Sequence, residues 1–303
     1  MFRSFHEIED YISKGKFTKS IALAGSHDLD TLSSVVNARR KNIISAVLVG
    51  DITKTKSLLK KMDEPDDLYK FIEEPDSNKA AHCVCRLVAE GKADMPMKGK
   101  VMTADFMRAV LDKQYNFVPH GGIMSQATVA EYPEANRLLI ISDCAVNINP
   151  DYSIKKIILA SAVNLAHQLG VSCPKVAIIT PVEVVNPAIP ATIDAAMLAK
   201  DGDRGLFPGC IIDGPLALDN ALDNDAAAAK NIGGPVAGNA DILIMPDLCT
   251  GNVFTKSLHY IAHTRQSGNI TGANIPVVMT SRTDTPDDKY YSILISVLQS
   301  LRQ

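Results

Sequence analysis

Short apolar runs alternate with longer amphipathic runs along nearly the whole chain. The short runs are rich in Ile, Val and Leu and contain few alternating polar residues, a pattern typical of strands that helices cover on both faces. The runs with this character are predicted to be strands, namely Ser20–Ala24, Ala46–Val49, Leu68–Ile72, Leu138–Ser142, Val176–Thr180, Cys210–Asp213, Ile242–Met245 and Pro276–Thr280.

The longer runs repeat their apolar residues at helical spacing. In residues 153–169, for example, Ile154 and Ile158 fall on one face, Ser153 is the expected N-cap and Gly170 the expected stop. The predicted helices are Asp28–Arg40, Asn78–Glu90, Thr103–Lys113, Ser153–Leu169, Leu216–Ala229, Asn252–Gln266 and Asp287–Leu301. Because strands and helices alternate, the expected fold class is α/β with a largely parallel sheet.

Two stretches interrupt the alternation. Asn116–Pro133 is weakly periodic and is expected to be a connection between domains or a loop at a site, and Ser267–Asn274 contains two glycines and two asparagines. A length of 303 residues fits two α/β domains. If both breaks are domain crossings, the first domain comprises residues 1–135 plus 271–303, and the second comprises residues 136–270.

Composition narrows the class of protein. Hydrophobic residues make up 46% and charged residues 21%, as in ordinary globular proteins. The formal net charge of -3 gives no general attraction to nucleic acid or anionic lipid, so any anion site must be local. No apolar run reaches the roughly 20 residues of a membrane span, and the N-terminus does not resemble a signal peptide. With six cysteines and no C-x-x-C pair, we expect reduced thiols and a cytoplasmic protein.

The segment with the strongest chemical character follows the last predicted strand. Ser281, Arg282 and Thr283 come directly after that strand, and a helix begins a few residues later. Ligands of open α/β sheets bind beyond the carboxyl ends of the strands, and a helix start favours an anion. The guanidinium of Arg282 fits two phosphate oxygens at once. The alternative is a capped turn, with Thr285 as N-cap and Pro286 at the first helical position.

Three other junctions carry candidate ligands. Asp213 and Asp219 flank a Gly-Pro break and can orient a substrate, although a turn followed by a solvated helix residue also explains them. Gly251 and Asn252 are expected to open a helix and leave its N–H groups free, unless they form a simple cap. Lys98 can meet a phosphate, although a lysine in this setting is more often solvated.

Together these segments resemble the phosphate acetyl/butyryltransferase family, and their detailed sequences are closer to the butyryl branch than to the acetyl branch. The matches occur in family order over about two-thirds of the chain, which makes the set far more specific than any one member. The matching stretches are Met97–Gly99 with Thr103–Phe106, Ile141–Asp143 with Asn147–Pro150, Asn186–Pro187 with Pro190–Ala195, Asp213–Ala221, Pro235–Gly238 with Ala240–Leu243, Pro246–Asp247 with Gly251–Asn252 and Lys256–Leu258, and Thr280–Arg282.

The resemblance implies an architecture and a reaction. The fold should be similar to the isocitrate and isopropylmalate dehydrogenases, with two α/β domains, a cleft between them and a C-terminal segment that returns to the first domain. The family usually forms a homodimer, so a homodimer or higher homo-oligomer is expected. The reaction converts acyl-CoA and phosphate into acyl phosphate and coenzyme A, with no permanently bound cofactor and with no nucleic acid or membrane as partner.

The resemblance also assigns residues. The family's cleft serine and arginine correspond to Ser281 and Arg282, and its proposed base, seven positions after that serine, corresponds to Asp288. Asp284 and Asp287 are alternatives for the base, because the local sequence differs from the acetyl branch.

A wider set of residues is expected to bind substrate, and no metal site is expected. These residues are Lys98, Ser125, Asp213, Asp219, Asn220, Gly251, Asn252, Thr283 and Asp284. The chain departs from the family after Ser125, where Gln126 replaces the histidine common in the butyryl branch. The acetyl branch also has an arginine in the loop that follows this segment, whereas the present chain has none between Ser125 and Arg137.

The mechanism expected from this resemblance is direct transfer in a ternary complex. Phosphate itself attacks the thioester carbonyl, so the protein aligns the substrates and stabilises the oxyanion. Butyryl transfer is the main expectation and acetyl transfer the alternative. Two rivals of other classes are a metal- and NAD-dependent decarboxylating dehydrogenase on the same fold and a sensor that binds acyl-CoA without turnover.

Overall fold

The computed structural model describes residues 1–302 and divides into two compact units. Unit 1 consists of Met1–Ser4 and Ile123–Gln266. Unit 2 consists of Phe5–Gly122 and Ser267–Gln303, so it contains both the N-terminal third of the chain and the C-terminal segment. Parallel and mixed sheets alternate with helices in these units, which confirms the predicted α/β class.

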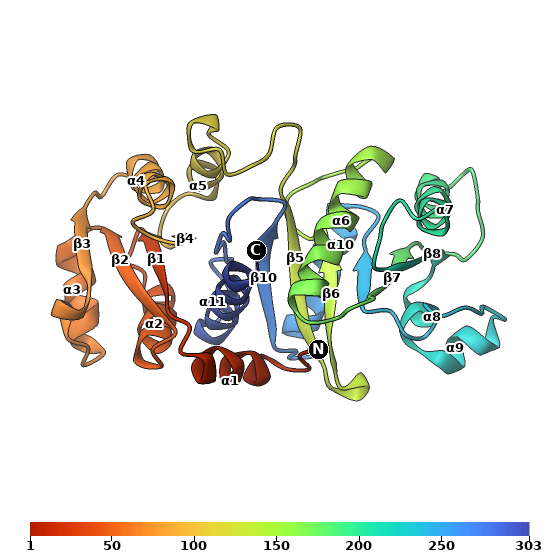
Figure 1. The fold of residues 1–303 in the computed structure, drawn as a ribbon, viewed down its shortest axis with the longest axis horizontal. Helices are drawn as coiled ribbons and strands as arrows, with labels where there is room; N and C mark the ends of the chain where they lie inside the picture. Colours follow the sequence, from red (N-terminus) through yellow and green to blue (C-terminus); the bar gives the residue numbers. More distant parts are fainter. Residues whose placement is uncertain (303) are drawn as a thin grey trace. The chain divides into compact units, whose positions relative to one another are not determined.

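Unit 2 is built on a parallel sheet with the order β3-β2-β1-β4. Its strands are β1 (Lys19–Ala24), β2 (Ile44–Gly50), β3 (Lys70–Glu73) and β4 (Met95–Lys98). Its helices are α1 (Phe5–Gly15), α2 (Leu29–Arg40), α3 (Ile52–Lys61), η1 (Asp66–Leu68), α4 (Ser77–Ala89), α5 (Thr103–Val110) and η2 (Lys113–Tyr115). The helices α4 and α5 pack together, and α2 packs with α3, so the buried strands are covered by helices (Figure 1).

The C-terminal segment completes unit 2. It contributes β10 (Gln266–Thr271) and α11 (Pro286–Leu301), and α11 packs on α1 and α2. Residues 276–280 do not form the strand predicted there. Only Val278 forms a bridge, parallel to Met97 of β4, because the backbone leaves the sheet after this single pair.

Unit 1 contains a mixed sheet. Its strands are β5 (Ser125–Tyr132), β6 (Arg137–Ser142), β7 (Lys175–Ile179), β8 (Ile211–Leu216) and β9 (Ile242–Ile244). The pair β5–β6 is antiparallel, and β6-β9-β7-β8 follow in parallel. The helices are η3 (Pro133–Ala135), α6 (Tyr152–Gln168), α7 (Pro190–Asp203), α8 (Leu218–Leu222), α9 (Asn224–Ala229) and α10 (Leu248–Tyr260).

Most predicted elements are present, and the exceptions have identifiable causes. The strands β4, β5 and β10 were not predicted, because β4 contains a proline and the other two lie in stretches read as breaks. The predicted break at Gly214–Pro215 is wrong, since β8 continues through both residues to Leu216. Helices α1, α3 and α7 were also missed. The N-cap of α6 is Asp151 rather than Ser153.

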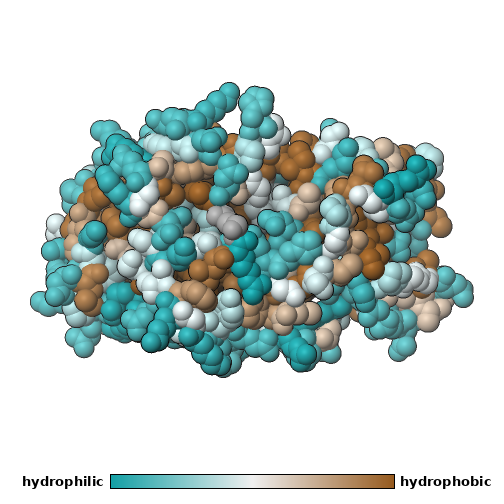
Figure 2. Space-filling model, viewed as in Figure 1, coloured by the Kyte–Doolittle hydropathy of each residue, from teal (hydrophilic) through white to brown (hydrophobic). Residues whose placement is uncertain are grey.

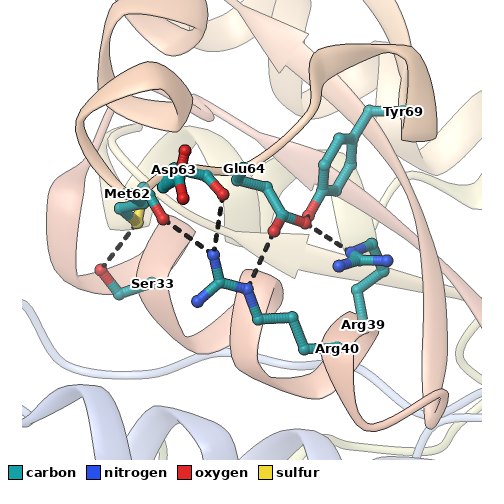
Figure 3. Close-up of polar contacts among 7 residues, drawn as sticks. All are labelled: Ser33, Arg39, Arg40, Met62, Asp63, Glu64 and Tyr69. Atoms are coloured by element: carbon teal, nitrogen blue, oxygen red, sulfur yellow. Dashed lines mark hydrogen bonds and ion pairs between the residues drawn. The ribbon is translucent and has the colours of Figure 1, made fainter.

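A charged network fastens the loop after α3 to α2 (Figure 3). Glu64, whose side chain is almost fully buried, lies 2.5 Å from Arg39 Nε and accepts a hydrogen bond from Arg40 Nε at 2.9 Å. The Tyr69 hydroxyl donates to the same carboxylate at 2.7 Å. Burial by itself raises the pKa of Glu64, but the contacts with Tyr69, Arg39 and Arg40 outweigh burial and hold its pKa below its ordinary value.

The surface carries some exposed apolar side chains. Figure 2 shows hydrophobic residues at the surface around the positions of α7 and β8. The exposed residues on these elements and in the loop before α7 are Val184, Val185, Ile193, Met197 and Ile211. Within residues 1–302, no helix is both long and apolar enough to cross a membrane. All six cysteines are free thiols, and Cys83, Cys85 and Cys144 are the buried ones.

Candidate active site

A cationic pocket lies at the carboxyl ends of the strands of unit 2. Its volume is about 330 Å³. The residues that line it come from the end of β4 and the loop after it, the starts of α2, α4 and α11, and the segment before α11: Asp28, Thr31, Ser77, Lys98, Gly99, Lys100, Val101, Met102, Thr280, Ser281, Arg282 and Lys289. Four of these side chains are cationic, and among the described residues Asp28 supplies the one carboxylate of the wall. This pocket is therefore a candidate local anion site, although the net charge of the protein is -3.

Backbone hydrogen bonds bring two distant parts of the sequence to this pocket. Lys98 N–H donates to the Val278 carbonyl at 2.9 Å, and Val278 N–H donates to the Pro96 carbonyl at 3.0 Å. Through these two bonds Val278 alone pairs with the edge of the parallel sheet, and the residues after it leave the sheet. Ser281 and Arg282 consequently lie beside Lys98 in the wall of one pocket.

Two glycines allow the loops that follow β1 and β4 to touch. Gly25 has a φ of +70°, and a Cβ there would lie 2.6 Å from the Lys100 backbone carbon. A Cβ on Gly99 would lie 2.6 Å from the Gly25 carbonyl oxygen. Any side chain at either position would push the loops apart. The Lys-Gly-Lys sequence thus places Lys98 and Lys100 against the end of β1.

Lys98 is a buried cation without a direct ion-pair partner among the described residues, and the carboxylates of Asp28 and Asp284 act on it only from a distance. The residue is 3% exposed, and its ammonium makes no hydrogen bond or ion pair with any of the described residues. Burial lowers the pKa of Lys98 below the ordinary value for lysine, and the positive charge of Arg282 lowers it further. A buried ammonium without a partner is unfavourable, so this arrangement is suited to an anionic ligand.

The loop that carries Ser281 and Arg282 is held by short-range hydrogen bonds. Asp284 accepts from Ser281 N–H at 2.7 Å, and the hydroxyls of Ser281 and Thr283 lie 3.2 Å apart. Arg282 is exposed and contacts the sulfur of Met102 at 3.5 Å through Nη2. The Arg282 guanidinium is therefore accessible to a ligand.

The three candidate bases differ in their surroundings. Asp288 is buried and forms a capping box, in which it accepts from Thr285 Oγ at 2.6 Å and Thr285 N–H at 3.1 Å. Thr285 is therefore the N-cap of α11, as predicted. Asp284 serves the loop described above, and Asp287 is exposed in the first turn. Of the described residues that line the pocket, none is one of these three aspartates.

The sequence analysis missed Lys289. This residue is 2% exposed, lines the pocket and donates a hydrogen bond to the Asp284 carbonyl. A signal was present in the sequence, because a lysine in the first turn of a helix opposes the helix dipole. Such a residue in an otherwise apolar helix face points to a purpose other than helix stability.

A second pocket lies at the carboxyl ends of β7, β8 and β9 in unit 1. Its volume is about 860 Å³, and its wall is largely apolar. The residues that line it are Ile179, Thr180, Pro181, Ile189, Ala191, Ala217, Leu218, Asp219, Leu222, Asp223, Pro246, Asp247 and Thr250. This pocket suits a ligand with a long apolar portion.

Of the acidic candidates in unit 1, one lines this pocket and one does not. Asp219 lies in the wall, and its hydrogen bond with Lys230 lowers its pKa. Lys230 also pairs with Glu183 at 2.7 Å, and Glu183 accepts from the buried Asn220 at 2.6 Å. Asp213 lies within β8, where burial raises its pKa. The prediction that Asp213 forms a turn is wrong.

Gly251 and Asn252 have packing contacts that the sequence did not reveal. The helix α10 begins at Leu248, and Gly251 N–H donates to the Asp247 carbonyl, so the prediction of a free helix start at Gly251 is wrong. A Cβ on Gly251 would lie 2.3 Å from the Asp143 carbonyl oxygen. Asn252 donates to the Cys144 carbonyl at 3.2 Å. Both residues hold α10 against the loop after β6.

The loop after β6 is organised by Asp143. Its buried carboxylate accepts from Ala145 N–H at 2.8 Å and from Asn147 N–H at 3.0 Å. A further bond of 3.3 Å comes from Gln126 N–H in β5, one residue after the buried Ser125. The motif that contains Asp143 is therefore explained by local structure. Within residues 1–302, no group of three or more His, Cys, Asp or Glu side chains is placed to hold a metal ion.

Comparisons with known proteins agree on one family. Residues 73–297 match the family described as phosphate acetyl/butaryl transferase. The chain is 43% identical to phosphate butyryltransferase from Clostridium acetobutylicum over 298 residues, which covers 98% of each protein. It is 37% identical to phosphate acetyltransferase from Thermotoga maritima over 287 residues, which covers 95% of this chain and 97% of the relative. A branched-chain phosphotransacylase from Enterococcus faecalis V583 superimposes with a TM-score of 0.83 at 28% identity, covering 93% and 99% of the two chains.

Proposed function

The chain belongs to the phosphate acetyl/butyryltransferase family, and from that premise we propose that it transfers a short acyl group between coenzyme A and inorganic phosphate. The observation that carries this proposal is the buried Lys98 ammonium, which forms no ion pair with a described residue and lies beside Ser281 and Arg282. A phosphate dianion supplies the missing negative charge. The family resemblance read from the sequence is confirmed by the match.

In the proposed reaction, phosphate binds in the cationic pocket of unit 2. Arg282 presents its planar fork to two phosphate oxygens, and the hydroxyls of Ser281 and Thr283 donate further hydrogen bonds. Lys98 contributes a buried charge, whose attraction is strengthened because water is largely excluded there. The bound phosphate keeps one oxygen as the nucleophile, so the protein needs no nucleophilic side chain of its own.

Acyl-CoA is the second substrate. We assign its apolar portion to the pocket of about 860 Å³ in unit 1, whose wall includes Asp219. Attack of phosphate on the thioester carbonyl forms a tetrahedral oxyanion, which collapses to acyl phosphate and releases coenzyme A as the thiolate. Nearby cations, chiefly Arg282, stabilise the negative charge that develops.

In the direction that consumes acyl phosphate, the thiol of coenzyme A must lose a proton. A thiol with a pKa of about 8.5 is mostly protonated at neutral pH. We assign Asp288 as the group that accepts or orients this proton, with Asp284 and Asp287 as alternatives. Its capping box with Thr285 fixes the carboxylate at the start of α11.

Butyryl transfer is the main proposal, since 43% identity to a phosphate butyryltransferase extends over nearly the whole chain. Acetyl transfer is the alternative, because a phosphate acetyltransferase is 37% identical over a similar length. A single methylene changes binding by only about 1–3 kcal/mol, so both acyl groups are expected to react at different rates.

The experiment that tests the function is a thiol-release assay with acetyl-, propionyl-, butyryl- and isobutyryl-CoA, each with phosphate present or omitted. We expect release that depends on phosphate and is fastest with butyryl-CoA. Replacement of Arg282 by alanine should lower turnover by roughly 100-fold or more, the scale of losing one charge-stabilising donor. Near-normal transfer by this variant would remove Arg282 from the site.

We also propose a homodimer or higher homo-oligomer. The apolar side chains exposed on and beside α7, including Ile193 and Met197, are suited to contact between copies. Sedimentation of the protein as a monomer at micromolar concentration would refute this assignment. The likeness to isocitrate and isopropylmalate dehydrogenases, and domain limits near residues 135 and 271, stay predictions.

A further inference from the structure

Lys289 is a second buried cation in the wall of the phosphate pocket. It occupies the first turn of α11, and its ammonium donates to the carbonyl of Asp284 in the loop that carries Ser281 and Arg282. Within residues 1–302, no carboxylate forms an ion pair with this ammonium. Its neighbour in the wall, Lys98, likewise forms no ion pair with a described residue.

This placement of Lys289 is unfavourable by itself. A buried ammonium loses its hydration, and a positive charge at a helix start opposes the helix dipole. The two lysines also repel each other, and the charge of Lys289 contributes to the lowered pKa of Lys98. An apolar side chain at this position would remove all three costs but would also lose the hydrogen bond to the Asp284 carbonyl. That bond needs a donor and not a full positive charge, so an anionic ligand gives the charge itself a purpose.

We propose that Lys289 is a positioning residue of the phosphate site and that its charge makes the pocket bind a dianion in preference to a monoanion. Its hydrogen bond to the Asp284 carbonyl fixes the loop that presents Ser281 and Arg282. Its charge, added to that of Lys98, places two buried ammonium groups against one ligand, and two negative charges balance them. This inference rests on the proposed function, because it assumes that the anion is phosphate.

Kinetics of Lys289→Met test the role in the reaction. The thiol-release assay should show a KM for phosphate that rises roughly 10- to 100-fold, the scale of losing one hydrogen bond to a charged group. The KM for butyryl-CoA should change by less than about twofold, since that substrate is assigned to unit 1. Lys289→Gln serves as a second variant if the methionine variant does not fold.

Thermal unfolding with added anions provides a readout that does not need turnover. At a pH above the second pKa of phosphate, where phosphate like sulfate is a dianion, both ions should raise the Tm of the wild-type protein, and nitrate should raise it much less. Lys289→Met should lose most of the shift produced by the two dianions. The matched control is Lys155→Met, which removes a buried lysine of α6 that pairs with Asp194 at 2.7 Å outside this pocket. That control should lower the Tm of the free protein without changing the shift that phosphate produces.

The outcomes separate this inference from the proposed function. If phosphate-dependent thiol release is present in the wild type and both Lys289 variants keep its KM for phosphate and its dianion shift, the inference is overturned while the function stands. If the wild type shows no phosphate-dependent release, the function fails. In that case, loss of the dianion shift in the Lys289 variants supports a dianion site, and an unchanged shift overturns it.

Discussion

Lys98→Met should make the ligand-free protein more stable and the enzyme less active. The wild-type ammonium is buried, forms no ion pair with a described residue, and has a pKa lowered first by burial and then by Arg282. Methionine has a similar length and no charge, so it removes the desolvation cost. Replacing buried ionic groups by apolar residues stabilises proteins by up to about 1–4 kcal/mol, and we expect a gain at the lower end of this range.

The dependence on pH has a definite sign. Because the pKa of Lys98 is lower in the folded than in the unfolded state, the unfolded state binds more protons between the two values. The free energy of unfolding of the wild type should therefore rise relative to the variant as pH increases toward about 10.4, the ordinary pKa of lysine. The slope cannot exceed about 1.4 kcal/mol per pH unit for one proton. Phosphate affinity should fall over the same window as Lys98 loses its charge.

Urea denaturation with and without phosphate measures both effects. At a phosphate concentration 100 times its Kd, the wild type gains about 2.7 kcal/mol, whereas a variant that binds 100-fold more weakly gains about 0.4 kcal/mol. Lys100→Met is the comparator, since Lys100 lines the same pocket but is exposed, and its ligand-free stability should change by no more than about 0.5 kcal/mol. The reasoning is refuted if Lys98→Met is less stable than wild type without phosphate and keeps the full phosphate-linked gain.

Two further substitutions test other parts of the structure. Glu64→Gln removes the carboxylate shared by Arg39 and Arg40 and, because these partners are partly exposed, should cost about 1–3 kcal/mol at pH 7 by urea denaturation. The wild type should lose the same stabilisation as pH falls through the lowered pKa of Glu64, so equal costs at pH 7 and at low pH would contradict the assignment. Asp288→Asn should lower turnover of acyl phosphate with coenzyme A by about 100-fold or more if Asp288 handles the thiol proton. The same substitution should lower the free energy of unfolding by about 0.5–2 kcal/mol, because it weakens the capping box. The exposed Asp287→Asn variant is the control. If Asp288→Asn loses stability but keeps its turnover, Asp288 acts only as a helix cap.

The contacts made by residues near in sequence were the most predictable. The cap of α11 is an example, because Thr285, Pro286 and Asp288 interact within one helical turn and their types suffice to define the helix start. The strands β1, β2 and β3 of unit 2 were likewise evident from their apolar runs, which in β1 and β2 reflect burial on both faces, whereas β4 and β10 were missed. The assignments of Gly251 and Asn252 failed for the opposite reason. Their role depends on Asp143 and Cys144, more than 100 residues earlier, which no local pattern encodes.

The sequence by itself determined the α/β class, the family, and the chemical character of Ser281 and Arg282, because these depend on residue types in a local order. Only the tertiary structure decided which cations share a pocket with them. From the sequence, Lys98 was better explained as a solvated residue and Lys289 was not singled out, whereas the fold buries both side chains without an ion-pair partner among the described residues. Burial and the distance between charges arise from parts of the chain that meet only in three dimensions, and these two quantities give an ammonium group its affinity for an anion.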